Sequence, residues 1–323
     1  MTDWIHTELI TPRLILRPWR EEDAEALCRF ASDPLVGPAA GWKPHTDVAY
    51  SREVIRTVFS TAEAYAIVLR YDAILPDGGC IPAGTPVGNI RILFRDNFTR
   101  CRMKENEAFL DFWMARPLWG RRLTPEAIEA VCERCFRELK LDTLWCSYFE
   151  QDESARRTQR KCGFIGDHDT RFPPHPLNGA RVEYFTQYPR WRYEEWERMR
   201  GCVTHEMHLN EAPFRAIAEG RKTVEMRLYD DKRSLIRVGD EIRFSLEWSE
   251  ESILTRVESI RYFPNFEALY DALLPTLGKS ALGYGEDEIP SPEDMLAYYP
   301  KDTVNRYGVV AIEISRIGRY NLP

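Results

Sequence analysis

The spacing of hydrophobic positions predicts alternating strands and helices in the first part of the chain. Alternation and β-rich composition predict strands at 9–18, 65–71, 87–94, 108–114 and 144–149. Apolar residues three or four apart predict helices at 21–30, 51–59, from 124 onward and at 154–161. The helix from Thr124 has the clearest start, because threonine can cap it, Pro125 suits its first turn and Glu126 favours its positive end.

The pattern changes beyond residue 201, where predicted strands outnumber helices. Strands are predicted at 203–209, 222–228, 240–246, 253–262 and 307–314. Helices are predicted at 212–219, 266–274 and 290–299. Many short strands with few helices are typical of a small β-barrel.

The stretch 188–200 joins these two segments and is rich in aromatic and charged residues. We expect a linker helix whose tryptophan and tyrosine side chains, those of Trp191, Tyr193 and Trp196, pack on the first segment. The alternative is a basic and aromatic platform for nucleic acid, but the glutamates within 194–197 cancel much of its charge. Because 323 residues fit two domains, we place one at 1–200 and the other at 201–323.

Composition and charge fit a soluble globular chain. Hydrophobic residues make up 44% and charged residues 29% of it, which excludes collagen-like and disordered chains. No apolar run is long enough to cross a membrane, so no membrane partner is expected. The net charge of −7 means that the chain as a whole lacks the excess of positive charge typical of nucleic-acid-binding proteins. The 8 cysteines are scattered along the chain, as in proteins of a reducing compartment. The first residues lack the basic and apolar segments of a signal peptide, so we expect a cytoplasmic protein.

Two short patterns resemble metal-binding motifs. Cys132 and Cys135 are three positions apart within a predicted helix, but no second cysteine pair follows them. His205 and His208 face opposite sides of a predicted strand, because their separation is odd. We therefore expect no metal site.

The predicted strand 108–114 leads through a turn at Gly120 into the helix from Thr124. The first amides of a helix have no partner within it, and the helix dipole is positive there, so such a turn can bind an anion. Arg121 and Arg122 add positive charge at the same place. This arrangement predicts capture of a pyrophosphate, although a purely structural strand, turn and helix has a similar pattern.

Three motifs make the chain from about 8 to 197 resemble the GNAT N-acetyltransferases, in the branch of the ribosomal-protein-alanine acetyltransferases. They are Thr11-Pro-Arg-Leu-Ile-Leu-Arg-Pro, Pro117-Leu-Trp-Gly-Arg-Arg-Leu-Thr-Pro-Glu-Ala and Gln159-Arg-Lys-Cys-Gly-Phe. The resemblance implies a central mixed sheet flanked by helices, with acetyl-CoA in a V between strands 109–114 and 144–149. It implies that main-chain groups of Trp113 and Met114 bond the pantetheine arm. It also implies that turn amides hold the pyrophosphate, namely those of Gly120, Arg121, Arg122, Leu123 and Thr124.

The resemblance further implies that a primary amine attacks the thioester directly, with a carboxylate or a water chain as base. Phe109 stands where the family often has a glutamate, so Asp111 and Glu107 are the remaining carboxylates, and Asp111 is the preferred base. Trp42 and His45 lie in a region that forms part of the acceptor pocket in the family. The alternatives are a structural role for Asp111 and a solvated position for His45.

Three further positions depart from the family pattern. Arg122 replaces a second small residue in the turn, and Asp152 and Ala155 replace an asparagine and a serine ahead of the last helix. An aspartate near CoA phosphates repels them. The alternative to an active enzyme is therefore a degenerate scaffold that serves as an RNA-binding or nucleotide-binding module.

In the second segment, Glu225 and Arg227 point to one face of a predicted strand and Lys222 lies at its start. Together they can hold a phosphate or a polar base edge, and the alternative is an exposed ion-pair cluster. With Gly220 they match the signature of ASCH domains, which residues 203–316 resemble. This resemblance implies a PUA-like barrel that binds RNA or modified nucleosides in the cleft beside the signature.

One ASCH branch is similar to an acetylcytidine amidohydrolase and has a lysine at the place of Lys222, but a hydroxyl residue where this chain has Glu225. The combined prediction is a two-domain α+β protein, a GNAT fold joined to a PUA-like barrel. We expect an acetyl-CoA-dependent N-acetyltransferase that acts on a small molecule, a protein N-terminus or a ribonucleoprotein, with the ASCH domain recruiting RNA. The alternatives are the degenerate scaffold and an ASCH amidohydrolase of acylated nucleosides.

Overall fold

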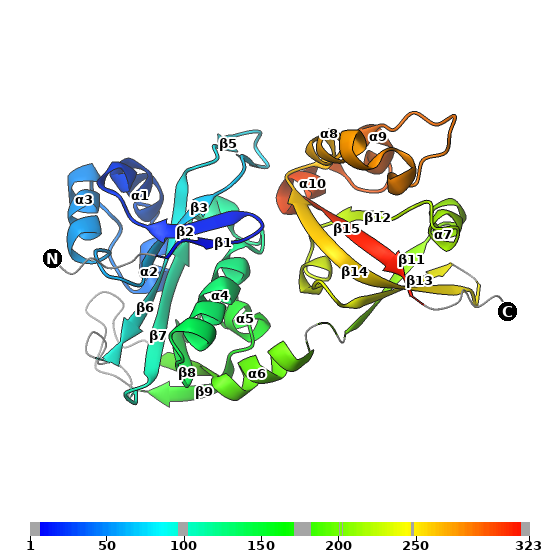
Figure 1. The fold of residues 1–323 in the computed structure, drawn as a ribbon. Helices are drawn as coiled ribbons and strands as arrows, with labels where there is room; N and C mark the ends of the chain where they lie inside the picture. The colour runs from blue at the N-terminus through cyan, green and yellow to red at the C-terminus, as the bar shows by residue number, and fades with distance from the viewer. Residues whose placement is uncertain are drawn as a thin grey trace. The chain divides into compact units, whose positions relative to one another are not determined.

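The computed structural model describes residues 7–95, 103–170, 182–199, 201, 203–246 and 249–317. The chain divides into two compact units, one of Met1–Ala73 and Cys80–Glu195 and one of Ile74–Gly79 and Trp196–Pro323. Each unit has its own sheet and helices (Figure 1). Within the described ranges, no helix is both long and apolar enough to span a bilayer.

The first unit is built on an eight-stranded sheet in the order β1-β2-β3-β6-β7-β8-β10-β9. Its strands are β1 (Leu9–Ile10), β2 (Leu14–Pro18), β3 (Ala64–Leu69), β6 (Pro86–Phe94), β7 (Glu107–Met114), β8 (Thr143–Phe149), β9 (Ile165–Thr170) and β10 (Glu183–Pro189). Neighbouring strands are antiparallel except for β7 and β8, which are parallel. The predicted mixed sheet is thus confirmed. The short strands β4 (Ala73–Ile74) and β5 (Cys80–Ile81) pair separately.

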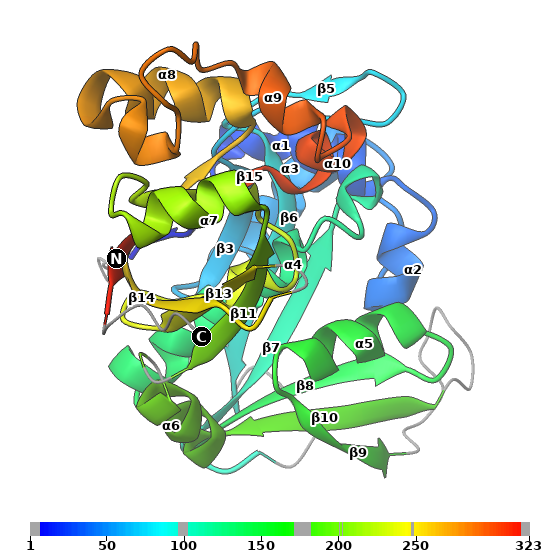
Figure 2. The ribbon, with the colours of Figure 1, turned by 90° about the vertical axis from the view of Figure 1, so that its right-hand side faces the viewer.

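Helices cover both faces of this sheet. They are η1 (Glu21–Asp23), α1 (Ala24–Ala31), α2 (Val36–Ala40), α3 (Val48–Thr57), η3 (Arg116–Leu118), α4 (Leu123–Glu133), the π-helical turn η4 (Arg134–Glu138), α5 (Glu153–Lys161) and α6 (Arg190–Met199). The helices α1 to α3 lie on one side and α4 and α5 on the other (Figures 1 and 2). Their apolar stripes explain this, since Leu27 and Phe30 of α1 and Ile128 and Val131 of α4 are buried.

The linker region differs in one respect from the sequence prediction. Strand β10 was not predicted, because its buried positions include the polar residues Glu183 and Thr186 and so hide the alternation. The helix α6 therefore begins at Arg190 rather than at 188. The expected packing is confirmed for Tyr193, which is 4% exposed and stacks on Phe136 with ring centroids 5.1 Å apart. It was wrong for Trp191, whose side chain is 54% exposed.

The second unit contains a five-stranded sheet in the order β11-β13-β14-β15-β12. Its strands are β11 (Thr204–Leu209), β12 (Val224–Leu228), β13 (Glu241–Leu246), β14 (Ser252–Phe263) and β15 (Val309–Arg316). Its helices are α7 (Glu211–Ala218), η5 (Arg233–Leu235), α8 (Phe266–Leu277), η6 (Ser280–Leu282), α9 (Pro292–Leu296) and α10 (Lys301–Tyr307). The single helix predicted at 290–299 was wrong: α9 is short, and Pro300 precedes a second helix that was not predicted.

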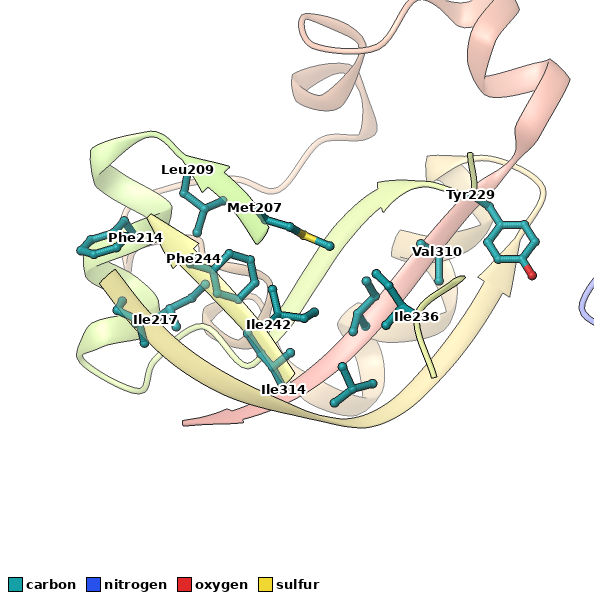
Figure 3. Close-up of a cluster of buried hydrophobic side chains, with 13 residues drawn as sticks. Met207, Leu209, Phe214, Ile217, Tyr229, Ile236, Ile242, Phe244, Val310 and Ile314 are labelled. Carbon is teal, nitrogen blue, oxygen red and sulfur yellow. The ribbon is translucent and has the colours of Figure 1, made fainter. Parts of the chain in front are cut away.

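The second sheet curls because β14 changes partners along its length. It pairs with β13 through residues 252–256 and with β15 through 255–263, with an irregularity between Val257 and Ser259. Such a bulge bends a strand and increases its twist. Apolar side chains fill the curl, among them Ile242, Phe244 and Val310 (Figure 3). The predicted PUA-like, barrel-type sheet is confirmed.

Candidate functional site

The strands β7 and β8 are paired only at their first residues. The paired segment is 107–109 of β7 against 143–145 of β8, although β7 continues to Met114 and β8 to Phe149. Within the described residues, 110–114 have no partner on β8, whereas β7 pairs with β6 from Ala108 to Met114. The two parallel strands therefore open into a V.

The register with β6 decides which main-chain groups of β7 face this V. Bonds in an antiparallel pair alternate, so every second residue directs both its N–H and its C=O to the partner. The amide of Ala115 donates to the carbonyl of Val87 at 2.7 Å, which places Trp113 among the residues that bond β6. The main-chain groups of Phe112 and Met114 point to the other side, into the V. The register thus replaces Trp113 by Phe112 as a residue expected to bond the pantetheine arm. Met114 keeps this expectation for its amide, since its carbonyl accepts from the indole of Trp119 at 2.7 Å.

The turn after β7 has an unusual backbone. Gly120 and Arg122 have φ values of 71° and 62°, in the left-handed region that favours glycine. Because α4 begins at Leu123, the amides of Leu123 and Thr124 belong to its first turn and have no acceptor within the helix. The predicted residues of the anion site are therefore brought together at one helix end, including the buried Arg121. The amide of Arg121 does not meet the expectation of a pyrophosphate contact, because it donates to the carbonyl of Leu118 at 3.4 Å.

Three side chains in and near this turn have well-defined partners. Arg122 directs its guanidinium along α4, where Nη2 lies 3.1 Å from Glu129 Oε1. The indole of Trp119 donates to the carbonyl of Met114 at 2.7 Å and ties the turn to the end of β7. Asp152, which departs from the family pattern, caps α5 by accepting from the amide of Ala155 at 2.9 Å. That bond gives Asp152 a structural role at the helix start.

On the face of β7 that meets α2, Asp111 pairs with Arg91 of the neighbouring strand. The distance from Arg91 Nε to Asp111 Oδ2 is 2.7 Å, and the Asp111 side chain is 27% exposed. Asp111 belongs to the part of β7 that opens into the V. It is therefore a partly accessible carboxylate at the expected place, with its charge partly balanced by Arg91.

Glu107 lies at the closed end of the V and is 6% exposed. It accepts hydrogen bonds from the amide of Lys104 and from Trp145 Nε1, each at 2.9 Å. Phe109 packs nearby in an apolar cluster with Phe185. These contacts give Glu107 a structural role at the closed end of the V, where the two strands are paired.

Trp42 and His45 are joined to the V by aromatic contacts. The ring of Trp42 meets that of Trp113 at 5.7 Å and that of His45 at 5.4 Å. His45 is 8% exposed, so the expectation of a solvated loop position was wrong, and burial lowers its pKa.

A hydrogen bond holds the ring of His45 in place. Its Nδ1 lies 2.8 Å from the hydroxyl oxygen of Ser51, which in turn lies 3.0 Å from the carbonyl oxygen of Asp47.

In the second unit, Lys222, Glu225 and Arg227 form a buried ion cluster. Glu225 Oε1 lies 2.7 Å from Arg227 Nε, and Glu225 Oε2 lies 3.4 Å from Lys222 Nζ. The side chains of Lys222 and Glu225 are only 5% and 4% exposed, so the expectation of an exposed ion-pair cluster was wrong. Glu225 Oε2 has no hydrogen-bond donor among the described residues, because the lysine contact lacks hydrogen-bond geometry.

Neighbouring elements hold the two cations of this cluster in place. Lys222 Nζ donates to the carbonyl of Leu282 at 3.1 Å. A Cβ on Gly283 would lie 2.9 Å from Lys222 Cδ, so glycine leaves room for the lysine stem. Arg227 donates to the carbonyl of His208 at 3.0 Å and contacts the hydroxyl of Tyr299 at 3.4 Å. The spacing in the sequence predicted the three charged residues but not these partners.

The two metal-like patterns have other partners. His205 Nε2 lies 2.9 Å from Asp240 Oδ2, and His208 Nδ1 lies 2.8 Å from Ser245 Oγ. Cys132 and Cys135 are buried free thiols whose pKa values burial raises. Across the part of the chain that the structure describes, no group of three or more His, Cys, Asp or Glu side chains could hold a metal ion.

Family models match both parts of the chain. A model described as an acetyltransferase (GNAT) domain matches residues 13–165, and a model of the ASCH domain matches residues 207–318. The V between β7 and β8 and the turn before α4 lie inside the first match. The cluster of Lys222, Glu225 and Arg227 lies inside the second.

Individual proteins and structures are also similar. The uncharacterized N-acetyltransferase p20 of Bacillus licheniformis is 25% identical over 142 residues, which are 42% of this chain and 70% of that protein. RimJ of Mycobacterium smegmatis, solved with CoA-disulfide, is 16% identical over 58% of this chain and 87% of its own, with a TM-score of 0.44. The structure of the hypothetical protein PH0355 is 30% identical over 36% of this chain and all 100% of its own, with a TM-score of 0.29.

Proposed function

Because the chain is a GNAT acetyltransferase with a GNAT domain at 13–165 and an ASCH domain at 207–318, we propose that it transfers the acetyl group of acetyl-CoA to a primary amine held beside Asp111. The V between β7 and β8 carries this proposal. Such an opening exposes main-chain groups of β7 that can bond an extended pantetheine arm. The turn amides before α4 then receive the pyrophosphate, with the positive end of the helix behind them.

Acetyl-CoA, when bound, supplies a thioester that the amine attacks, and the protein positions the partners and removes a proton. Asp111 attracts the ammonium form of the acceptor and takes its proton, in the manner of a general base. An N–H of β7 that faces the V, such as that of Phe112, stabilises the oxyanion of the tetrahedral species. Trp42 and Trp113 form an aromatic wall that attracts a cation. A positively charged aliphatic amine fits this combination best.

The proposal is tested by calorimetric titration with acetyl-CoA, followed by detection of released CoA thiol. A peptide amine, a polyamine and an aminosugar serve as acceptor probes. Asp111→Asn is expected to lower kcat about 10²- to 10⁴-fold, and Glu107→Gln is expected to lower it much less. Absence of heat with millimolar acetyl-CoA contradicts the proposal and favours the degenerate scaffold. An Asp111→Asn variant with full activity removes Asp111 as the base.

We propose that the second unit binds a nucleoside of a single-stranded RNA beside the cluster of Lys222, Glu225 and Arg227. The supporting observation is the unused acceptor on the buried Glu225, since a base amine or amide N–H would satisfy it. The neighbouring cations would attract a phosphate. The domain would then bring an RNA or ribonucleoprotein acceptor to the enzyme.

This second role is tested by fluorescence anisotropy with a labelled single-stranded octanucleotide, and by calorimetry with cytidine and N4-acetylcytidine. Lys222→Met is expected to weaken RNA binding about tenfold or more, as for loss of a charge-assisted contact. Lys232→Met is the control, because Lys232 is exposed in the following loop. Equal effects of the two changes contradict a site at Lys222. Conversion of N4-acetylcytidine to cytidine favours the amidohydrolase alternative.

A further inference from the structure

Arg13 is distant in sequence from the turn before α4 but bonds it directly. The residue precedes β2 and is 5% exposed. Its Nη1 donates to the carbonyl of Arg121 at 2.9 Å, and its Nη2 donates to the carbonyl of Arg122 at 3.2 Å. One guanidinium therefore holds two consecutive carbonyls of the turn.

The guanidinium of Arg13 is itself held by Glu126, which is 4% exposed. Arg13 Nε donates to Glu126 Oε2 at 2.7 Å, and the amide of Arg13 donates to Oε1 at 2.7 Å. The hydroxyl of Thr11 donates to the same Oε1 at 2.5 Å. Since the fork of an arginine is planar and rigid, these bonds fix the direction of its remaining donors.

The direction of the two carbonyls determines the direction of the following amides. In a trans peptide, C=O and N–H point to opposite sides. Because the carbonyls of Arg121 and Arg122 point to Arg13, the N–H groups of Arg122 and Leu123 point away from it, toward the outside of the turn. The same two bonds hold Arg122 at a φ of 62°, a conformation that a residue with a side chain rarely keeps.

We propose that Arg13 is the positioning residue for the pyrophosphate-binding amides of the turn, with Glu126 as its support. The inference rests on the proposed use of acetyl-CoA at this turn. Arg13 itself does not touch the cofactor in this arrangement. The family turn usually has a second small residue, whose flexible backbone lets the amides approach the phosphates. In this chain Arg122 stands there instead, and Arg13 fixes the direction of the N–H groups of Arg122 and Leu123.

The test compares the binding of CoA, which has a pyrophosphate, with that of pantetheine, which has none. Arg13→Gln is expected to raise the Kd of CoA at least about tenfold, because small misplacements of binding groups have effects of that size. The Kd of pantetheine should stay within about twofold, since the V is unchanged. The control is Arg17→Gln, because Arg17 is equally buried and pairs with Asp23 through bonds of 2.7 Å and 2.8 Å. CoA is measured by calorimetry and pantetheine by ligand-observed NMR, below the melting temperature of each variant.

The outcomes separate the two proposals. A wild-type chain that does not bind CoA overturns the proposed function, whatever the variants do. If the wild-type chain binds CoA and the Arg13→Gln and Arg17→Gln variants have the same Kd for CoA, only the role of Arg13 is overturned. If Arg13→Gln does not fold, Arg13→Lys replaces it, because lysine keeps the charge but cannot donate to both carbonyls as a planar fork. A folded Arg13→Lys chain with unchanged CoA affinity also overturns the role of Arg13.

Discussion

Glu225→Gln is expected to destabilise the ASCH domain by about 3–5 kcal/mol, the usual effect of removing one partner from a buried ion cluster. Glu225 is 3% exposed and lies between two buried or nearly buried cations. The glutamine keeps the shape of the side chain but leaves Lys222 and Arg227 close together without a counter-charge. Urea unfolding should show the loss, and hydrogen exchange in β12 and β15 should localise it, since these strands pair beside the cluster.

The matched control for this change is Glu241→Gln in β13. Glu241 also pairs with an arginine, Arg256, but at 4.0 Å, and its side chain is 30% exposed. A largely exposed ion pair of this kind contributes at most about 1 kcal/mol to the free energy of unfolding. Equal losses for the two variants would show that the cluster at Glu225 is not an essential part of the domain's core.

Gly88→Ala is expected to abolish measurable binding of acetyl-CoA. A Cβ at this position would lie 2.5 Å from the carbonyl oxygen of Trp113 and 3.3 Å from Met114 Cα. Both are backbone atoms, so β7 must move away from β6 at the point where its main chain faces the V. Because a displacement of about 1 Å can reduce catalysis about 10²-fold, acetyl transfer should fall by at least that factor. Calorimetry with acetyl-CoA and a CoA-release assay measure the two losses.

Gly79→Ala is the control for Gly88→Ala. At Gly79 the nearest atom to an added Cβ is Asp77 Oδ1 at 3.0 Å, the end of an exposed side chain that can rotate away. This variant should bind acetyl-CoA as the wild type does. Wild-type affinity in Gly88→Ala would disprove the close approach of β6 and β7 and the placement of cofactor groups derived from it.

Local sequence patterns determined most of the elements and the two candidate sites. Alternation predicted the strands that contain Leu16 and Phe244, because burial of one strand face leaves a period of two in the sequence. The strand that contains Ile90 is buried on both faces around that residue and was predicted from its β-rich composition. The Thr-Pro-Glu sequence predicted a helix start close to the turn, but the expected cap was wrong: α4 begins at Leu123, and Arg122 precedes it without a side-chain cap hydrogen bond. The charged residues of the ASCH signature were likewise found from their spacing along one strand.

Only the tertiary structure decided how these residues are used. The direction of the main-chain groups in β7 depends on its register with β6, which a single strand does not reveal. This register moved the proposed pantetheine contact from Trp113 to Phe112. The partners of Asp111 and Lys222 are 20 and 60 positions away in the sequence. The bonds from Arg13 to the turn span more than 100 positions. Local propensities do not encode such contacts, because they form only when the packing of the whole domain brings distant segments together.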